Sequence, residues 1–231
     1  MPALRSDIDP RGLLEFSVVF TDRSLNHMSA AFREVMLDIH ATLCEVHKAE
    51  RAVIVPGGGT YAMEAVARQF ATGRKVLVIR NGLFSYRWTQ IFEAGAVPAE
   101  EIVLKARRQG EGRTAPFAPP PMAEVTATIR RERPQVVFAP HVETASGIIL
   151  PDEYVKAVAE ATHEAGGFFV LDGVASGCIW VDMAALGVDV LVSAPQKVWS
   201  APPSAGLVMI REAALEECRP ARSTSLISAS G

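Results

Sequence analysis

Lys197 is the only charged residue between Asp189 and Arg211. It follows a largely apolar run, residues 190–195, and precedes a loop of small residues and prolines. A lysine removed from water and from carboxylates tends to have a lowered pKa, because burial penalises its charged form. An amine with a lowered pKa can form a Schiff base at neutral pH, so we expect a desolvated, Schiff-base-forming Lys197.

Asp172 ends another apolar run and is the only charged residue between Glu164 and Asp182. An acid closing one buried strand and a lysine just past the next are the pair that pyridoxal phosphate (PLP) requires. The lysine holds the aldehyde, and the aspartate keeps the pyridine nitrogen protonated so that the ring can accept electrons. Alone, each residue has an ordinary explanation, as a buried structural carboxylate or a surface lysine. Their positions at the ends of successive strands favour the cofactor.

Three glycines, Gly57, Gly58 and Gly59, precede Thr60 between an expected strand and an expected helix. The backbone N–H groups of such a turn and the positive end of the helix can bind a phosphate, and Thr60 can add a hydroxyl. No lysine follows, so the turn is not a nucleotide P-loop, and its spacing is not that of the dinucleotide fingerprint. The alternative is a tight turn without a ligand.

Polar and aromatic residues follow three other expected strands. Phe84 could stack on a flat cofactor ring, or it could be a core aromatic. Thr144 could hydrogen-bond the phenolic oxygen of PLP, and Gln196 could donate to its phosphate. His141 and Glu143 are too few to hold a metal ion, and no third ligand falls nearby, so we expect no metal and favour a hydrogen-bonding role in the loop for them.

Short β-rich runs alternate with helical patterns, which indicates an α/β fold with a mostly parallel sheet between two layers of helices. Too little chain separates Lys197 from the last strand for a helical crossover, so that strand is expected to be antiparallel. Residues 107–121 are expected to form a surface loop. The seven strands are expected at residues 52–56, 75–80, 101–104, 135–139, 168–172, 189–193 and 205–210. Helices are expected at residues 28–47, 60–71, 84–93, 122–131 and 152–165.

Composition excludes several classes of function. The chain has 231 residues, of which 49% are hydrophobic and 21% are charged, as is typical of a soluble globular protein. A net charge of -3 without a basic block argues against nucleic acid as the main partner. No apolar run approaches the roughly 20 residues that cross a bilayer, so no membrane partner is expected. Three widely spaced cysteines and the absence of an apolar N-terminal stretch predict a cytoplasmic location.

Four motifs, in order, resemble the class V aminotransferases of the fold-type I PLP enzymes, and most of all the alanine/serine–glyoxylate aminotransferases. The resemblance runs from about Asn26 to Arg222. The motifs are Gly57-Gly-Gly-Thr-Tyr-Ala-Met-Glu64, Glu143-Thr-Ala-Ser-Gly147, Asp172-Gly-Val-Ala-Ser176 and Ser193-Ala-Pro-Gln-Lys197 with Ala201-Pro-Pro203. The family usually carries a serine where Gly58 stands, so one phosphate donor is missing here.

The resemblance implies a role for each site residue. Lys197 would form the Schiff base with PLP and then move the proton between the substrate α-carbon and the cofactor, while Asp172 would pair with the pyridinium nitrogen. Phe84 would stack on the ring and Thr144 would contact its phenolic oxygen. The phosphate would be bound by Gly58, Gly59, Thr60 and Gln196.

The resemblance also implies the organisation of the protein. Residues 1–222 would form the PLP-binding large domain, a three-layer α/β/α unit with residues 1–27 as an N-terminal arm, and residues 223–231 would be an irregular tail. The small C-terminal domain of the family is expected to be absent, and with it the arginine that binds the substrate carboxylate. The family forms homodimers, so a homodimer is expected.

The predicted function is the transfer of an amino group from a small amino acid, such as alanine or serine, to glyoxylate or pyruvate. One alternative is a truncated chain that binds PLP without turnover. Another is a different class V reaction, such as that of a lyase or a desulfurase, for which Cys218 is a poor candidate for the required mobile cysteine.

Overall fold

The computed structural model describes residues 30–197 and 199–218. The chain divides into two compact units, Met1–Thr42 and Leu43–Gly231, and helix α1 (Ala30–His47) begins in the first and ends in the second. The expected N-terminal arm, residues 1–27, and the expected tail, residues 223–231, lie outside the described residues, as do the first two residues of the expected helix 28–47. The sheet and the residues of the candidate site lie in the second unit.

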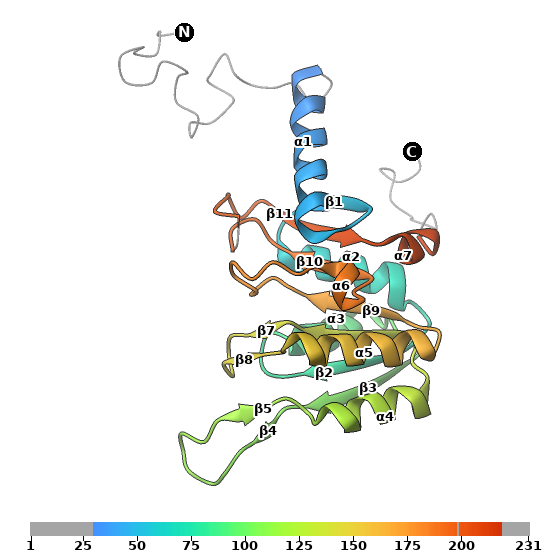
Figure 1. Cartoon of the computed structure of the whole chain (residues 1–231), viewed down its shortest axis with the longest axis vertical. Coiled ribbons are helices and arrows are strands. Elements are labelled where there is room, and N and C mark those ends of the chain that lie inside the picture. Colours follow the sequence, from blue (N-terminus) through green and yellow to red (C-terminus); the bar gives the residue numbers. More distant parts are fainter. Residues whose placement is uncertain (1–29, 198, 219–231) are drawn as a thin grey trace. The chain divides into compact units, whose positions relative to one another are not determined.

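Seven strands form one sheet in the order β1-β11-β10-β9-β6-β2-β3 (Figure 1). Strand β11 runs antiparallel to both of its neighbours, β1 and β10, whereas the remaining pairs are parallel. The prediction of a mostly parallel seven-stranded sheet with one antiparallel strand is confirmed, and each strand begins and ends within one residue of its expected bounds. The strands are β1 (Arg51–Pro56), β2 (Lys75–Arg80), β3 (Glu100–Lys105), β6 (Val136–Pro140), β9 (Phe168–Asp172), β10 (Val190–Ser193) and β11 (Ala205–Ile210).

Helices cover both faces of this sheet, which gives the expected three layers (Figure 1). One face packs against α4 (Met122–Glu132), α5 (Asp152–Glu164) and the short helix α6 (Met183–Leu186). The other packs against α2 (Gly59–Ala71), α3 (Tyr86–Gly95) and α7 (Glu212–Glu216). Neither α6 nor α7 was among the expected helices, because each is too short to show a helical period.

The central strands are apolar on both sides because alternate residues enter two separate cores. In β2, for example, Leu77 and Ile79 pack toward α4 and α5, whereas Val76 and Val78 pack toward α2 and α3. All four side chains are fully buried. This double burial fixes the register of the sheet, since a shift by one residue would exchange the two cores.

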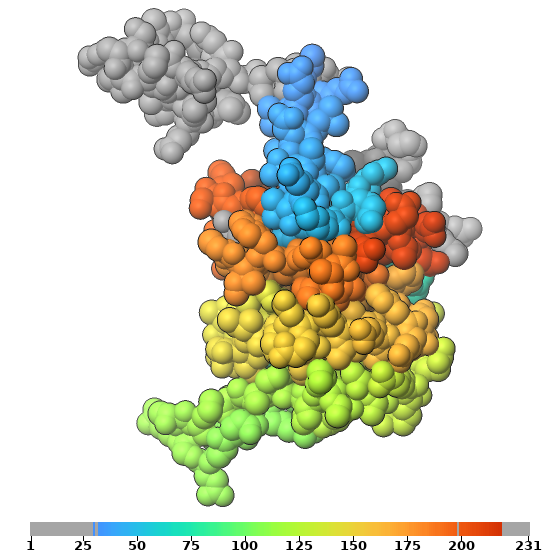
Figure 2. Space-filling view, viewed as in Figure 1, coloured from blue at the N-terminus to red at the C-terminus, as the bar shows by residue number. Residues whose placement is uncertain are grey.

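Two short hairpins form in segments where the sequence predicts neither a helix nor a strand. Strands β4 (Arg107–Arg108) and β5 (Phe117–Ala118) pair within the expected surface loop (Figure 1), and the green segment that contains them projects from the surface (Figure 2). Strands β7 (Val142–Glu143) and β8 (Ile148–Ile149) form the second hairpin directly after β6. The expected surface loop at 107–121 is exposed over most of its length, and the only difference is that two residues near each end pair as short strands, which needs no apolar pattern.

Candidate active site

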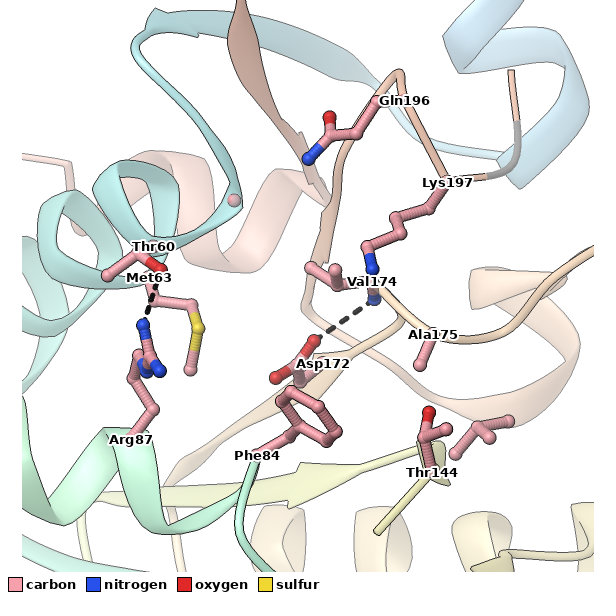
Figure 3. Close-up of a pocket in the computed structure, with 12 residues that line it drawn as sticks. Thr60, Met63, Phe84, Arg87, Thr144, Asp172, Val174, Ala175, Gln196 and Lys197 are labelled. Atoms are coloured by element: carbon pink, nitrogen blue, oxygen red, sulfur yellow. Dashed lines mark hydrogen bonds between the residues drawn. The ribbon is translucent and has the colours of Figure 1, made fainter. Parts of the chain in front are cut away.

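A cavity of about 190 Å³ opens where the carboxyl ends of the parallel strands meet (Figure 3). Open α/β sheets bind ligands at this edge, because loops from several strands converge there. Of the eight residues predicted from the sequence, seven line the cavity: Gly59, Thr60, Phe84, Thr144, Asp172, Gln196 and Lys197. The eighth, Gly58, lies next to the lining as the N-cap of α2.

The glycine turn lies between β1 and α2. Gly57 has a φ of +123°, a conformation that favours glycine, and its N–H donates to the carbonyl oxygen of Ser204 at 2.9 Å. Gly58 is extended, and its carbonyl oxygen accepts from the N–H groups of Tyr61 and Ala62. No side chain caps α2, so the N–H groups of Gly59 and Thr60, at the start of the helix, can donate to an anion at the cavity.

Arg87 is a cavity residue that the sequence analysis missed. Its Nη1 donates to Thr60 Oγ1 at 3.1 Å, which places a permanent positive charge beside the glycine turn (Figure 3). The signal was present in the sequence, because Arg87 would lie one turn after Phe84 in the expected helix 84–93, although α3 begins only at Tyr86. Val174 and Ala175, which follow Asp172, also line the cavity and were not predicted.

Asp172 ends β9 and is only 7% exposed. Burial raises the pKa of its carboxyl group to about 6, although a hydrogen bond from the Val174 N–H, at 3.0 Å, opposes the rise. The negative charge of Glu143 adds to the rise. The Trp88 indole has the smallest effect and lowers this pKa. Its N–H is buried and lies outside hydrogen-bonding geometry to any described residue.

Lys197 lies in the loop after β10, and its side chain extends toward Val174 and Asp172 (Figure 3). The residue is exposed, so the expectation of a desolvated lysine is wrong. A lack of charged neighbours along the chain does not bury an amine, and the loop that carries Lys197 lies at the rim of the cavity. Its position beside a buried carboxylate is nevertheless the predicted one.

Phe84 and Thr144 line the cavity from the ends of β2 and β7. Phe84 is 45% exposed, which rules out the alternative that it is a core aromatic. The neighbouring residues His141 and Glu143 have the expected hydrogen-bonding role, and most of their partners lie in other loops. His141 Nδ1 lies 2.8 Å from Ser176 Oγ, burial lowers the pKa of His141, and Glu143 accepts from backbone N–H groups.

The described residues contain no group of three or more histidine, cysteine, aspartate or glutamate side chains arranged to hold a metal ion. Nor does any helix in the described part of the chain have the length and apolar character to cross a membrane.

The chain is similar to several aminotransferases. It is 27% identical to alanine–glyoxylate aminotransferase from Rattus norvegicus over 213 residues, which cover 90% of this chain and 47% of the relative. It is 29% identical to 2-aminoethylphosphonate–pyruvate transaminase from Paraburkholderia phymatum over 211 residues, or 88% of this chain and 53% of the relative.

Among solved structures, alanine–glyoxylate aminotransferase from Nostoc sp. matches with a TM-score of 0.72 and 28% identity. The match covers 86% of this chain and 50% of that one. The chain therefore spans about half the length of the relatives that it matches.

The comparison with protein families agrees with the geometry. The sequence pattern of the family described as Aminotransferase class-V matches residues 15–228, which is nearly the whole chain. The matched range contains the glycine turn, Asp172 and Lys197, the residues that the fold gathers around one cavity. The chain belongs to the class-V aminotransferase family.

Proposed function

We propose that this chain is the PLP-binding large domain of an aminotransferase, which moves an amino group from a small amino acid to a 2-oxo acid such as glyoxylate or pyruvate. The observation that carries the proposal is the pairing of a buried carboxylate, Asp172, with an amine, Lys197, around one cavity. The names of the relatives support glyoxylate and pyruvate as acceptors.

The residues around the cavity fit PLP. The uncapped start of α2 and the Arg87 guanidinium provide a site for the phosphate at one end. A carbon atom added at Gly58 would meet no atom within 4 Å, so the backbone there is open to a ligand. The buried Asp172 carboxylate has the donor chemistry that a protonated ring nitrogen requires.

Bound PLP supplies an electron-accepting ring that stabilises negative charge on the α-carbon of a substrate. In the proposal, Lys197 Nζ would hold the aldehyde and would later carry the proton of the substrate α-carbon. The Asp172 carboxylate would pair with the ring nitrogen and keep it protonated. Phe84 would contact the ring, and Thr144 would donate a hydrogen bond to the phenolic oxygen.

The phosphate group would be held by neutral and charged donors together. The N–H groups at Gly58 and Gly59, the Thr60 hydroxyl and the Gln196 amide would donate to its oxygens. Arg87 already donates to Thr60, so it would orient that hydroxyl and add a positive charge nearby.

The remaining features are proposed by resemblance to the family. The protein would be a cytoplasmic homodimer that uses no nucleic acid or membrane partner. Because the chain spans about half of its relatives, binding of PLP without turnover is a second candidate for the chain by itself. A desulfurase is less well supported, because burial raises the pKa of the Cys218 thiol and so disfavours the reactive thiolate.

The test is a titration of the purified chain with PLP, followed by absorbance, reduction with borohydride and mass spectrometry of the peptides. We expect a reduced adduct on Lys197, which Lys197→Ala abolishes and Lys156→Ala, at an exposed lysine of α5, does not. Adducts scattered over surface lysines would refute the proposal. If the adduct forms, assays with small amino acids and glyoxylate or pyruvate then separate turnover from binding alone.

A further inference from the structure

Glu143 is a carboxylate with no exposed surface, at the end of strand β7. Burying a charge is costly unless its hydrogen-bonding capacity is used. Both oxygens of Glu143 are used. Oε1 accepts from the N–H groups of Phe84 and Ala145, each at 3.2 Å. Oε2 accepts from the Ser85 N–H at 2.8 Å and from Ser85 Oγ at 2.7 Å.

These four partners are all neutral donors, which favours glutamate over glutamine at position 143. An ionised carboxylate only accepts, whereas a glutamine side chain of the same shape would place its NH₂ group against a backbone N–H donor whichever way the amide pointed. With the NH₂ group at the Oε1 position two hydrogen bonds would be lost, and at the Oε2 position the bond from the Ser85 N–H would be lost, because only the Ser85 hydroxyl can turn and accept. The charge on Glu143 therefore matters for holding this particular set of groups.

The donors belong to two loops that are far apart in the sequence. Phe84 and Ser85 follow β2, whereas Ala145 lies in the hairpin after β6, so the carboxylate joins segments about 59 residues apart. Phe84 is 45% exposed, and packing in the core therefore does not fix its position. The hydrogen bonds to Glu143 hold the backbone of Phe84 next to the hairpin that carries Thr144.

Gly82 shows how closely the two loops approach. A carbon atom added at Gly82 would lie 2.7 Å from Glu143 Cγ and from Glu143 Cδ. The backbone of Gly82 does not adopt a positive φ, so glycine is needed here for space and not for conformation. The loop after β2 therefore packs in direct contact with the Glu143 side chain.

We propose that Glu143 is a positioning residue that holds Phe84 and Thr144 in place at the cofactor cavity, so that both can contact the PLP ring. The inference rests on the proposed function, and it assigns to that site a residue that does not itself line the cavity.

Glu143→Gln tests the proposal in the full chain, with Glu153→Gln, at an exposed glutamate of α5, as the matched control. We expect PLP to bind about tenfold more weakly to Glu143→Gln, because at least one hydrogen bond is lost and the others are no longer charge-assisted. Amide hydrogen exchange at Phe84 and Ala145 should become faster in the cofactor-free chain. Inorganic phosphate, measured by competition with PLP, should bind as before, because its site at the glycine turn is untouched.

Gly82→Ala is the second variant, because the added methyl group would displace the Glu143 carboxylate without removing its charge. It also provides a test if Glu143→Gln does not fold. The same pattern, with weaker PLP and unchanged phosphate, supports the proposal. Equal loss of PLP and phosphate affinity would show a general structural role and overturn it, as would wild-type PLP affinity in Glu143→Gln. If the wild-type chain binds no PLP, the proposed function fails and takes this inference with it.

Discussion

The ionised Asp172 carboxylate should destabilise the cofactor-free chain, so Asp172→Asn should make that chain more stable at neutral pH. Burial raises the pKa of Asp172 from 3.8 to about 6. The folded chain therefore holds this proton more tightly than the unfolded chain does, and stability falls as the pH rises through that interval. Since one pKa unit corresponds to about 1.4 kcal/mol, the fall amounts to about 3 kcal/mol.

Urea denaturation of the wild-type and Asp172→Asn chains at about pH 4 and about pH 7.5 measures this difference. Near pH 4 the carboxyl group is largely protonated in the folded chain, and the two chains should have similar free energies of unfolding. At about pH 7.5 the variant should be more stable by up to about 3 kcal/mol. The difference between the two chains isolates Asp172, because every other titrating group is common to both.

The same substitution should weaken PLP binding, because the amide cannot form an ion pair with a protonated ring nitrogen. A variant that is more stable and yet binds the cofactor less well is typical of a residue kept for function at a cost in stability. If Asp172→Asn is less stable than the wild type by the same amount at both pH values, the reasoning from burial is wrong.

Three further predictions test the surroundings of the site. Thr60→Val should weaken PLP and phosphate by about tenfold each in the competition assay, because a hydroxyl donor is lost; unchanged phosphate binding would contradict the role of Thr60. Gly206→Ala should destabilise the chain by about 1–3 kcal/mol in urea, because the added carbon would lie 2.7 Å from the Gly58 carbonyl oxygen. The hydrogen bond to Asp189 raises the pKa of His163, so the stability from this pair is present below pH 6.5 and is lost as the pH rises through the folded-state pKa. His163→Gln should abolish this pH dependence, which amounts to less than about 1 kcal/mol because His163 is partly exposed; an unaltered pH profile would count against the pair.

The strands were predictable because each is a short apolar run bounded by turn residues. Phe138 and Leu171, for instance, lie in strands that are buried on both faces, and such strands are apolar along their whole length. The hairpins were not predictable in the same way. Arg107 and Arg108 pair with Phe117 and Ala118 through the backbone, which leaves no pattern in the side chains.

Helix α6 had a signal that was not used. Asp182 is its N-cap, and the side chain accepts a hydrogen bond from the Ala185 N–H at 2.9 Å. An aspartate before a short apolar segment is a recognised helix start. No local sequence pattern indicates that Lys197 is exposed, because its exposure depends on how the loop after β10 packs against the other elements.

The sequence by itself determined the order of the elements and the residues at the strand ends. Asp172 and Lys197 follow apolar runs of strand length, and parallel strands bring their carboxyl ends to one edge, so their meeting could be inferred. Only the tertiary structure decided the surroundings of those residues. The contacts of Glu143 with Phe84 and of Arg87 with Thr60 join residues 59 and 27 positions apart. Such contacts, and the burial that raises the pKa of Asp172, depend on distances in space that no local pattern of residues encodes.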